Sequence, residues 1–401
     1  MDADVVVVGA GIVGLATARA LRAHRPDRTV MVLDKETTPG HHQSGHNSGV
    51  IHSGVYYHPG SRKAALVASG RSELLGFVAA HGIGHEMCGK LVIAVDADET
   101  SRLDDLEARA SANRIPTRRL SPAEVREREP HIAAVAALEV PSAGIVDFGA
   151  VCRALATELG ADGVEIRLAT LVTDISSTTA TVTVMTSTGP VRAGSLVNCA
   201  GLHSDRVAAQ AGAGTDETRI MPFRGEYYEL REPARALVRG LVYPVPDPAF
   251  PFLGVHLTRM IDGSVHAGPN AVPALHREGY RRRDVSLRDA GEIVMSPRTW
   301  RLAGRYWRTG LGEIHRSLSK QAFVRALQRL CPDLTGADLI RTTSGVRAQA
   351  IDRRGRLLDD FAFAETARTT HVVNAPSPAA TAAFAIGEHI AVRHDRLTTP
   401  T

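Results

Sequence analysis

The sequence predicts an α/β protein in which a discontinuous Rossmann-like domain is combined with an inserted α+β substrate domain built on an antiparallel sheet. Three observations predict this fold. A strand, a glycine-rich turn, a helix and a second strand follow one another at the N-terminus. A second strand-to-helix turn lies near residues 199–205, and a strand–loop–helix unit closes the chain. Segments of different character separate these units, so we assign to the first domain residues 1–88, 142–215 and 335–401, and to the second 89–141 and 216–334.

The N-terminal unit is a βαβ element. Residues 5–8 are all valine, as in a strand that is buried on both faces. A helix is expected over 12–24, and a second apolar run over 29–33 ends at Asp34. The Asp34 carboxylate is therefore placed to accept hydrogen bonds from a ribose hydroxyl.

The turn between the first strand and the helix reads GAGIVG, which is a GxGxxG pattern. Gly9 allows the tight turn, Gly11 lets the backbone approach a pyrophosphate, and Gly14 permits close packing of the helix on the strand. The N-terminus of the helix adds unpaired N–H groups and a positive dipole end. Strand, glycines, helix and acid together predict dinucleotide binding.

Periodicity and turn residues predict the other elements in chain order. Helices are expected over 61–81, over 100–112 and from about 147, and strands over 90–95, 181–186 and 191–197. Several short, aromatic-rich strands of an antiparallel sheet are expected within 221–268. Residues 286–330 are expected to be mostly helical and are rich in arginine.

The composition is that of a globular protein, with 44% hydrophobic and 22% charged residues among 401. The four cysteines lie far apart without a CxxC pair, so we expect neither a zinc ribbon nor a disulfide framework. The N-terminus lacks the positive region of a signal peptide, and no apolar run reaches the roughly 18–20 residues of a membrane span. We expect a cytoplasmic protein without a nucleic-acid partner.

Histidines are concentrated in one stretch: five of the 17 lie within residues 41–58, beside Tyr56 and Tyr57. No Asp, Glu or Cys occurs between Thr37 and Ser72, so carboxylates near in sequence cannot complete a metal site, and we expect none. The repeated glycines of this stretch indicate instead a backbone that lies against a flat ligand. Because three nucleotide-type segments would meet such a ligand, FAD is favoured over a nicotinamide cofactor.

Longer motifs resemble the L-2-hydroxyglutarate oxidase/dehydrogenase family, within the larger group of D-amino-acid-oxidase-like flavoproteins. The resemblance spans nearly the whole chain and is carried by HHQSGHNSGVIHSGVYYHPGSRKA (41–64), PFRGEYYEL (222–230), HLTRMIDGSVHAGPNAV (256–272), SGVRAQAID (344–352) and NAPSPAATAAFAIGEHI (374–390). One departure is Asp34, where that family would be expected to have glutamate; the shorter arm could still reach a ribose.

This resemblance implies that the Rossmann-like domain is an FAD-binding domain, with the flavin ring near residues 43–53 and the FAD held non-covalently. It also implies oxidation of (S)-2-hydroxyglutarate to 2-oxoglutarate, with a quinone or another acceptor taking the electrons. With the glycine fingerprint, it places the cofactor contacts at Gly9, Gly11, Gly14, Asp34, Ser44, Asn47, Ser48, Gly49, Val172, Ala200, Gly201, Pro376 and Ser377.

A hydroxy acid with two carboxylates needs two cationic clamps and a group that takes the hydroxyl proton. Arg347 resembles the carboxylate-binding arginine of related flavoenzymes, and Arg259 is the candidate for the distal carboxylate. The candidates for the proton acceptor are His52, His256 and His266. For each of these residues the alternative is a structural ion pair or a hydrogen-bonded strand residue.

The segment 297–310, PRTWRLAGRYWRTG, interleaves arginines with both tryptophans of the chain. Two readings stay open: a peripheral contact with the inner face of the plasma membrane, near a quinone, or a solvated amphipathic helix. Two other functions also stay open. The chain could oxidise another 2-hydroxy acid or an amino acid, or it could bind the nucleotide as a sensor or scaffold.

Overall fold

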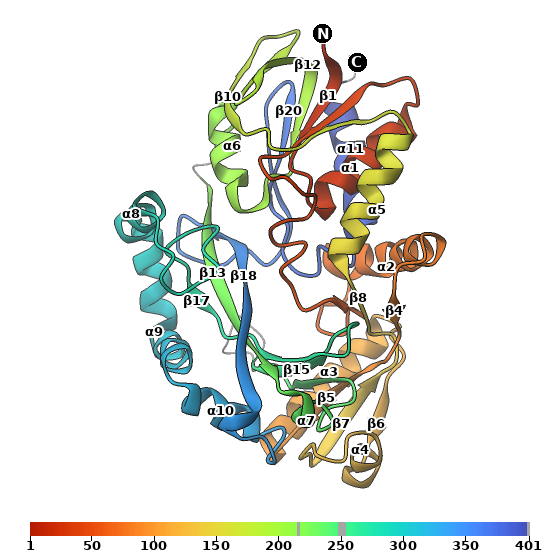
Figure 1. The fold of residues 1–401 in the computed structure, drawn as a ribbon, viewed down its shortest axis with the longest axis vertical. Helices are drawn as coiled ribbons and strands as arrows, with labels where there is room; N and C mark the ends of the chain where they lie inside the picture. Colours follow the sequence, from red (N-terminus) through yellow and green to blue (C-terminus); the bar gives the residue numbers. More distant parts are fainter. Residues whose placement is uncertain (215–216, 248–253, 399–401) are drawn as a thin grey trace.

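The computed structural model describes residues 1–214, 217–247 and 254–398. Figure 1 shows one part of the molecule that contains both chain termini and a second part at the opposite end. Two long strands, β13 (Thr218–Leu230) and β18 (Leu339–Asp352), run side by side from the region between these parts into the second one.

The first part is built on a parallel sheet, in agreement with the predicted Rossmann-like fold. Its strands are rich in valine and leucine, and the central ones are buried on both faces, because helices cover the sheet. In spatial order they are β9 (Glu165–Arg167), β2 (Val30–Leu33), β1 (Ala3–Val8), β12 (Gly189–Asn198) and β20 (Thr369–Asn374). Antiparallel additions are β10 (Val172–Ser177) and β11 (Val182–Thr186) beside β12, and β19 (Ala362–Glu365) beside β20.

Helices from the beginning, middle and end of the chain pack on this sheet or, in the case of α2, on a helix that covers it. They are α1 (Ile12–His24), α2 (Arg62–Ala80), α5 (Phe148–Ala161), α6 (Ser204–Gln210), which follows the short helix η1 (Gly201–His203), and α11 (Ala383–Thr398). Helices α1 and α11 approach closely, since a Cβ added at Gly387 would lie 2.5 Å from the carbonyl carbon of Ala16. The two ends of the chain therefore share one core, as a discontinuous domain requires.

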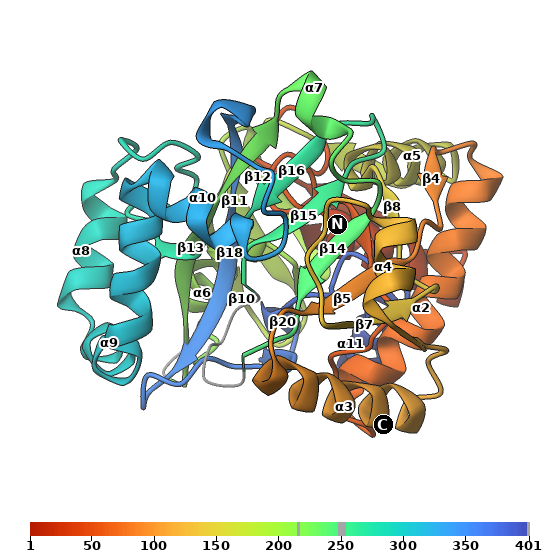
Figure 2. The ribbon, with the colours of Figure 1, turned by 90° about the horizontal axis from the view of Figure 1, so that it is seen from below.

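The second part is built on a mixed, mainly antiparallel sheet (Figure 2). Its order is β17 (Val272–Pro273), β13, β16 (Val265–Gly268), β15 (His256–Arg259), β14 (Leu241–Pro244), β5 (Lys90–Ala94), β7 (Ala136–Val140) and β6 (Arg118–Leu120). Strand β14 is parallel to β5. The accompanying helices are α3 (Ala97–Ala112), α4 (Pro122–Arg128), α7 (Glu232–Arg235), α8 (Leu287–Met295), α9 (Pro297–Leu318) and α10 (Lys320–Gln328), with the short helix η2 (Gly336–Asp338) before β18.

The last domain boundary differs from the one expected at residue 335. Strand β18 pairs with β13 from Leu339 to Asp352 and so belongs to the sheet of the second part. The chain returns to the first part only after this strand. Strand β13 is also longer than the short strands expected in this region, because its partner β18 extends the ladder along its whole length.

A small sheet lies between the two parts. Strand β8 (Gly144–Val146) pairs antiparallel with β3 (Val50–Ile51) and with β4 (His85–Glu86). It anchors the middle of the histidine-rich stretch, because His52 follows β3 directly. The predicted helical region 286–330 is confirmed as α8, α9 and α10, which Figure 1 shows at one edge of the molecule.

Candidate functional site

A cavity of about 1150 Å³ lies where the two parts meet. Pockets for a single small ligand typically measure roughly 300–1,000 Å³, so this one has room for a cofactor and a small substrate. Most of the site residues predicted from the sequence line it: Gly9, Gly11, Asp34, Ser44, Asn47, Ser48, His52, Val172, Ala200, Gly201, His256, Arg347, Pro376 and Ser377.

The glycine fingerprint forms one end of this cavity. Gly9 has φ of +110°, a left-handed conformation that favours glycine, and a Cβ at Gly14 would lie 1.9 Å from the Gly9 carbonyl oxygen. Gly14 is therefore a packing residue and does not line the cavity. Gly11 caps α1 without a side chain, and its neighbours Ile12 and Val13 line the cavity too. This open, amide-rich helix end fits a pyrophosphate.

Asp34 lies at the same end, and its carboxylate accepts two hydrogen bonds from the backbone of the protein itself. Its Oδ2 accepts the Ala10 N–H at 2.6 Å, and its Oδ1 accepts the Glu36 N–H at 2.9 Å. Each carboxylate oxygen can accept more than one hydrogen bond, so capacity for a ribose hydroxyl remains. The shorter aspartate is thus held close to the glycine turn, and the residues at this end fit a dinucleotide.

The loop after Glu36 is shaped by its own polar side chains. Ser44 Oγ accepts the Ile12 N–H at 3.0 Å. The Asn47 amide donates to the Ser44 carbonyl at 2.7 Å and accepts the Gly49 N–H at 2.8 Å. Gly49 has φ of +64° and does not line the cavity, so its role is in the turn. Asn47 and Gly49 therefore set the path of the backbone that faces the cavity.

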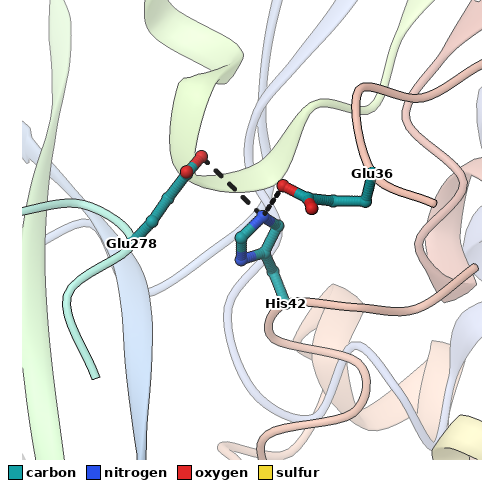
Figure 3. A group of neighbouring side chains, drawn as sticks. All are labelled: Glu36, His42 and Glu278. Carbon is teal, nitrogen blue, oxygen red and sulfur yellow. Dashed lines mark hydrogen bonds and ion pairs between the residues drawn. The ribbon is translucent and has the colours of Figure 1, made fainter. Parts of the chain in front are cut away.

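A group of charged side chains joins this loop to the second part of the molecule (Figure 3). His42 Nε2 lies 2.9 Å from Glu36 Oε1 and 3.7 Å from Glu278 Oε1. The stretch between Thr37 and Ser72 has no carboxylate of its own, but Glu36 just before it and Glu278 from a distant segment both lie near His42. The three residues could offer ligand atoms to a metal ion, but the Lys35 ammonium pairs with both carboxylates. We therefore describe them as an ion-pair network.

The pKa values in this network follow from its contacts. Burial alone would lower the pKa of Lys35, but hydrogen bonds to Glu278 and Glu36 hold it above its ordinary value. The pKa of Glu278 is strongly lowered despite burial, because His203 and Lys35 donate to its carboxylate. Burial and the nearby Lys35 charge lower the pKa of His42. A positive Lys35 and a negative Glu278 thus connect the two parts at neutral pH.

Two of the three candidate histidines lie together at the other end of the cavity. His256 stacks on Tyr243 with ring centroids 3.9 Å apart, and its Nδ1 lies 2.9 Å from the Gly254 carbonyl oxygen. An N–H at Nδ1 donates to that oxygen, which leaves Nε2 as a proton acceptor. His52 is fixed through its backbone N–H, which donates to Thr381 Oγ1 at 3.0 Å.

Both imidazoles are held neutral. Burial, together with the charges of Lys90 and Arg347, lowers the pKa of His52 to about 3. Burial and the same two charges lower the pKa of His256 to about 3, although the contact with Gly254 opposes this. Both rings therefore have a lone pair available at physiological pH.

Arg347 lies in β18, lines the cavity and is exposed. None of the described carboxylates forms an ion pair with it, so its guanidinium is available to an anionic ligand. The other predicted clamp, Arg259, does not line the cavity and pairs with Glu86. Side chains alternate across a strand, so Arg259 points away from the face of β15 that carries His256. This placement corrects the expectation that Arg259 faces the substrate.

His266 is also not brought to the cavity. It lies in β16 opposite Thr258, and its ring is 6.1 Å from that of Tyr227. Burial lowers its pKa, and the charges of Glu229 and Asp262 oppose this effect. The shared motif HLTRMIDGSVHAG suggested that both of its histidines belong to the site, but the hairpin places only His256 there.

Sequence reasoning missed Lys90 and Tyr243, which accompany Tyr56 beside the two histidines. The Lys90 ammonium lies 4.5 Å from the Tyr56 ring centroid and 4.7 Å from that of Tyr243. A signal was present: Lys90 is one of four lysines in an arginine-rich chain and opens the otherwise apolar strand KLVIA.

One known protein family matches nearly the whole chain. The family described as FAD dependent oxidoreductase matches residues 4–393. The chain belongs to this family. FAD is thus the dinucleotide that the glycine fingerprint, Asp34 and the open end of α1 fit, and these findings support the predicted non-covalent cofactor.

Within the FAD dependent oxidoreductases, several relatives share one name. The chain is 44% identical to the L-2-hydroxyglutarate dehydrogenase of Indibacter alkaliphilus over 96% of its length and 97% of the relative. It is 45% identical to that of Escherichia coli K12, over 96% and 92% of the two chains. It is 41% identical to the mitochondrial protein of this name from Homo sapiens, over 97% and 88%.

Several solved structures share the fold at lower identity. An L-α-glycerophosphate oxidase from Mycoplasma pneumoniae with FAD bound has a TM-score of 0.78 and 24% identity, over 98% of this chain and 94% of that one. A glycine oxidase from Geobacillus kaustophilus has a TM-score of 0.73 and 19% identity, over 98% and 95%. These likenesses support the predicted α/β architecture.

Proposed function

We propose that this protein oxidises (S)-2-hydroxyglutarate to 2-oxoglutarate. The observation that carries the proposal is that Arg347, which has no ion-pair partner among the described residues, lines one cavity with two neutral histidines and an FAD-type fingerprint. The relatives named L-2-hydroxyglutarate dehydrogenase, which match 96–97% of the chain, support the choice of substrate. FAD, when bound, supplies the acceptor for the hydride of the carbinol carbon.

In this proposal Arg347 binds the carboxylate next to the carbinol carbon. A planar guanidinium makes two parallel charge-assisted hydrogen bonds to a carboxylate, which fixes its position and its orientation. Arg347 pairs in register with Phe223 of β13, so the sheet sets the place of this clamp. Orientation of the carbinol is thus the contribution of Arg347.

His256 takes the hydroxyl proton on Nε2, and His52 stands beside it. The contact of His256 Nδ1 with the Gly254 carbonyl and the stacking on Tyr243 hold the acceptor nitrogen in place. With a pKa of about 3 the ring is neutral but a weak base. An anionic substrate offsets the charges of Lys90 and Arg347, and this raises the pKa of His256 when proton transfer is needed.

The test of the proposal is anaerobic mixing of the purified yellow protein with each enantiomer of 2-hydroxyglutarate. We expect the (S)-enantiomer to bleach the flavin absorbance within one turnover and 2-oxoglutarate to form in equal amount. Acid precipitation in a parallel sample should release FAD into the supernatant. Bleaching only by another 2-hydroxy acid or by an amino acid would replace the proposed substrate, and a colourless protein would contradict the FAD assignment.

We also propose that a quinone takes the electrons at a membrane surface that the protein contacts through α8 and α9. None of the helices in the described residues is long and apolar enough to span a bilayer. Large apolar side chains are nevertheless exposed along α8 and α9: Leu287, Val294, Met295, Trp300, Trp307, Leu311, Ile314 and Leu318. Arginines lie among them, and the Arg308 guanidinium lies 5.2 Å from the Trp307 ring centroid. Exposed apolar and basic residues on one helix are typical of a contact with anionic lipid.

Replacing Trp300 and Trp307 together with alanine is expected to abolish cosedimentation with anionic vesicles. Binding of the parent protein should be strong at low salt and weaker at high salt, because exposed charges are screened beyond a Debye length of about 8–10 Å. A matched control replaces two exposed apolar residues elsewhere, Val135 and Met185, with alanine. No cosedimentation of the parent protein at low salt would leave a solvated amphipathic helix as the explanation.

A further inference from the structure

Lys90 opens strand β5 and is almost completely buried, with 2% of its surface exposed. Its Nζ lies against the faces of Tyr56 and Tyr243, and among the described residues it has no hydrogen-bond acceptor. A buried cation is costly unless an anion or several acceptors compensate for the lost water. Two tyrosine rings supply only part of that compensation.

Each of the other three lysines of the chain donates to at least one acceptor. Lys35 pairs with Glu36 and Glu278, Lys63 donates to Asp359 at 2.6 Å, and Lys320 donates to the Leu339 carbonyl at 2.7 Å. In the part of the chain that the structure describes, Lys90 is thus the lysine whose charge is left uncompensated.

The position of Lys90 relates this charge to the cavity. Tyr56, Tyr243, His52 and His256 all line the cavity, and the charge of Lys90 reaches both histidines. The Tyr56 hydroxyl is also buried without a partner in the described residues. The same wall therefore holds two buried donors without acceptors, and a ligand carboxylate is the group that both would favour.

We propose that Lys90 selects for the second carboxylate of the substrate by placing a positive charge behind the wall formed by Tyr56 and Tyr243. The proposal rests on the proposed function and completes it: Arg347 binds one carboxylate, and Arg259 is unavailable for the other because it pairs with Glu86 outside the cavity. A charge one aromatic ring away still acts strongly on an anion, because water is excluded between them. Lys90 is thus a specificity-determining residue.

A purely structural lysine would have a different signature. Methionine has a similar length and no charge, and replacing a buried charge with an apolar side chain is often neutral or stabilising. If Lys90 only filled space, Lys90→Met would leave the preference for dicarboxylates unchanged. If its charge selects the second carboxylate, the same variant would lose affinity for dicarboxylates alone.

The experiment compares glutarate with butyrate, which has one carboxylate fewer, as ligands of the oxidised holoenzyme. Neither carries a hydroxyl group to be oxidised, so binding is followed through the shift of the flavin spectrum. Lys90→Met should raise the Kd of glutarate roughly 10- to 30-fold and that of butyrate less than about threefold. The matched control is Lys320→Met, since Lys320 lies 6.0 Å from a tyrosine ring centroid outside the cavity. Equal effects on both acids, or no effect on glutarate, would overturn the proposal.

A second measurement needs no variant and decides the matter if Lys90→Met does not fold. Burial lowers the pKa of Lys90 to about 7. A dicarboxylate favours the charged form of Lys90, so the Kd of glutarate should be constant between about pH 6 and 7, where both of its carboxyl groups are ionised, and rise by up to tenfold per pH unit above pH 7. The Kd of butyrate should stay flat in this range. A flat glutarate profile up to pH 9 would contradict the proposal.

The charged and titratable groups around Lys90 do not produce this profile. The two histidines, His52 and His256, are neutral above about pH 3. Burial raises the pKa values of Tyr56, Tyr243 and the Cys88 thiol. The remaining charged group is the guanidinium of Arg347, and a guanidinium does not lose its proton in proteins. Because glutarate is not a substrate, this result is independent of turnover. A protein that binds glutarate through Lys90 but does not oxidise 2-hydroxyglutarate would contradict the proposed function alone.

Discussion

Replacing His256 with alanine is expected to slow flavin reduction by roughly 100-fold or more at saturating (S)-2-hydroxyglutarate, the usual scale of general base catalysis. The reason is that His256 Nε2 is the acceptor nitrogen whose tautomer the Gly254 carbonyl fixes. Single-turnover absorbance at constant FAD content measures the effect. Because the step lost is proton transfer, the apparent affinity for substrate should change much less than the rate.

Two further variants, His52→Ala and His266→Ala, serve as comparisons for His256→Ala. His52→Ala should have a smaller effect, because no described residue orients its ring through a hydrogen bond. His266→Ala, outside the cavity, should reduce flavin at the parent rate. If His52→Ala loses the reaction while His256→Ala keeps it, the base is His52.

Arg347→Lys is expected to lower kcat/KM by roughly 30- to 150-fold. Lysine keeps the charge but loses the bidentate geometry, which removes about 2–3 kcal/mol from a charge-assisted pair. The loss should appear with every 2-hydroxy acid that the enzyme accepts, because the clamp binds the carboxylate that they share. Steady-state kinetics with two hydroxy acids of different length measures this.

Arg259→Lys is the matched control for Arg347→Lys. Arg259 pairs with Glu86 and lies outside the cavity, so kcat/KM should stay within about twofold of the parent value, as expected for a surface ion pair. A large loss in Arg259→Lys together with a small one in Arg347→Lys would exchange their roles. Both proteins must remain yellow for the comparison to hold.

The cofactor end of the molecule could be predicted from the sequence because its signals are local. Gly9, Gly14 and Asp34 act within one βαβ unit, where spacing along the chain determines spacing in the fold. The strands and the helix expected there agree with β1, α1 and β2 to within a residue or two. Local patterns also predicted the helical region that became α8, α9 and α10.

The substrate end depends on strand pairing, which a single sequence does not reveal. Arg259 and His256 are three residues apart, and alternation across β15 places them on opposite faces. The boundary after β18 was missed for the same reason, since its pairing with β13 joins residues more than 100 positions apart. Lys90 gave only a weak signal in the sequence, because its proposed role depends on contacts with Tyr56 and Tyr243, which only the fold brings next to it.

Strand β18 has a consequence for how the protein could change its substrate. It carries Arg347, and two neighbours of that arginine contact the loop that follows Glu36. The Ala348 N–H donates to Gln43 Oε1 at 2.8 Å. A Cβ added at Gly345 would lie 2.4 Å from the His46 carbonyl oxygen. The carboxylate clamp and the loop therefore move as one unit, so bending between the two parts cannot tune their separation. Insertion or deletion of one residue in β18 would turn Arg347 to the other face of the sheet. Substitutions in the wall around Lys90 could therefore adapt the site to substrates of other lengths. Strand β18 must keep its register, because it sets the distance between Arg347 and the cofactor.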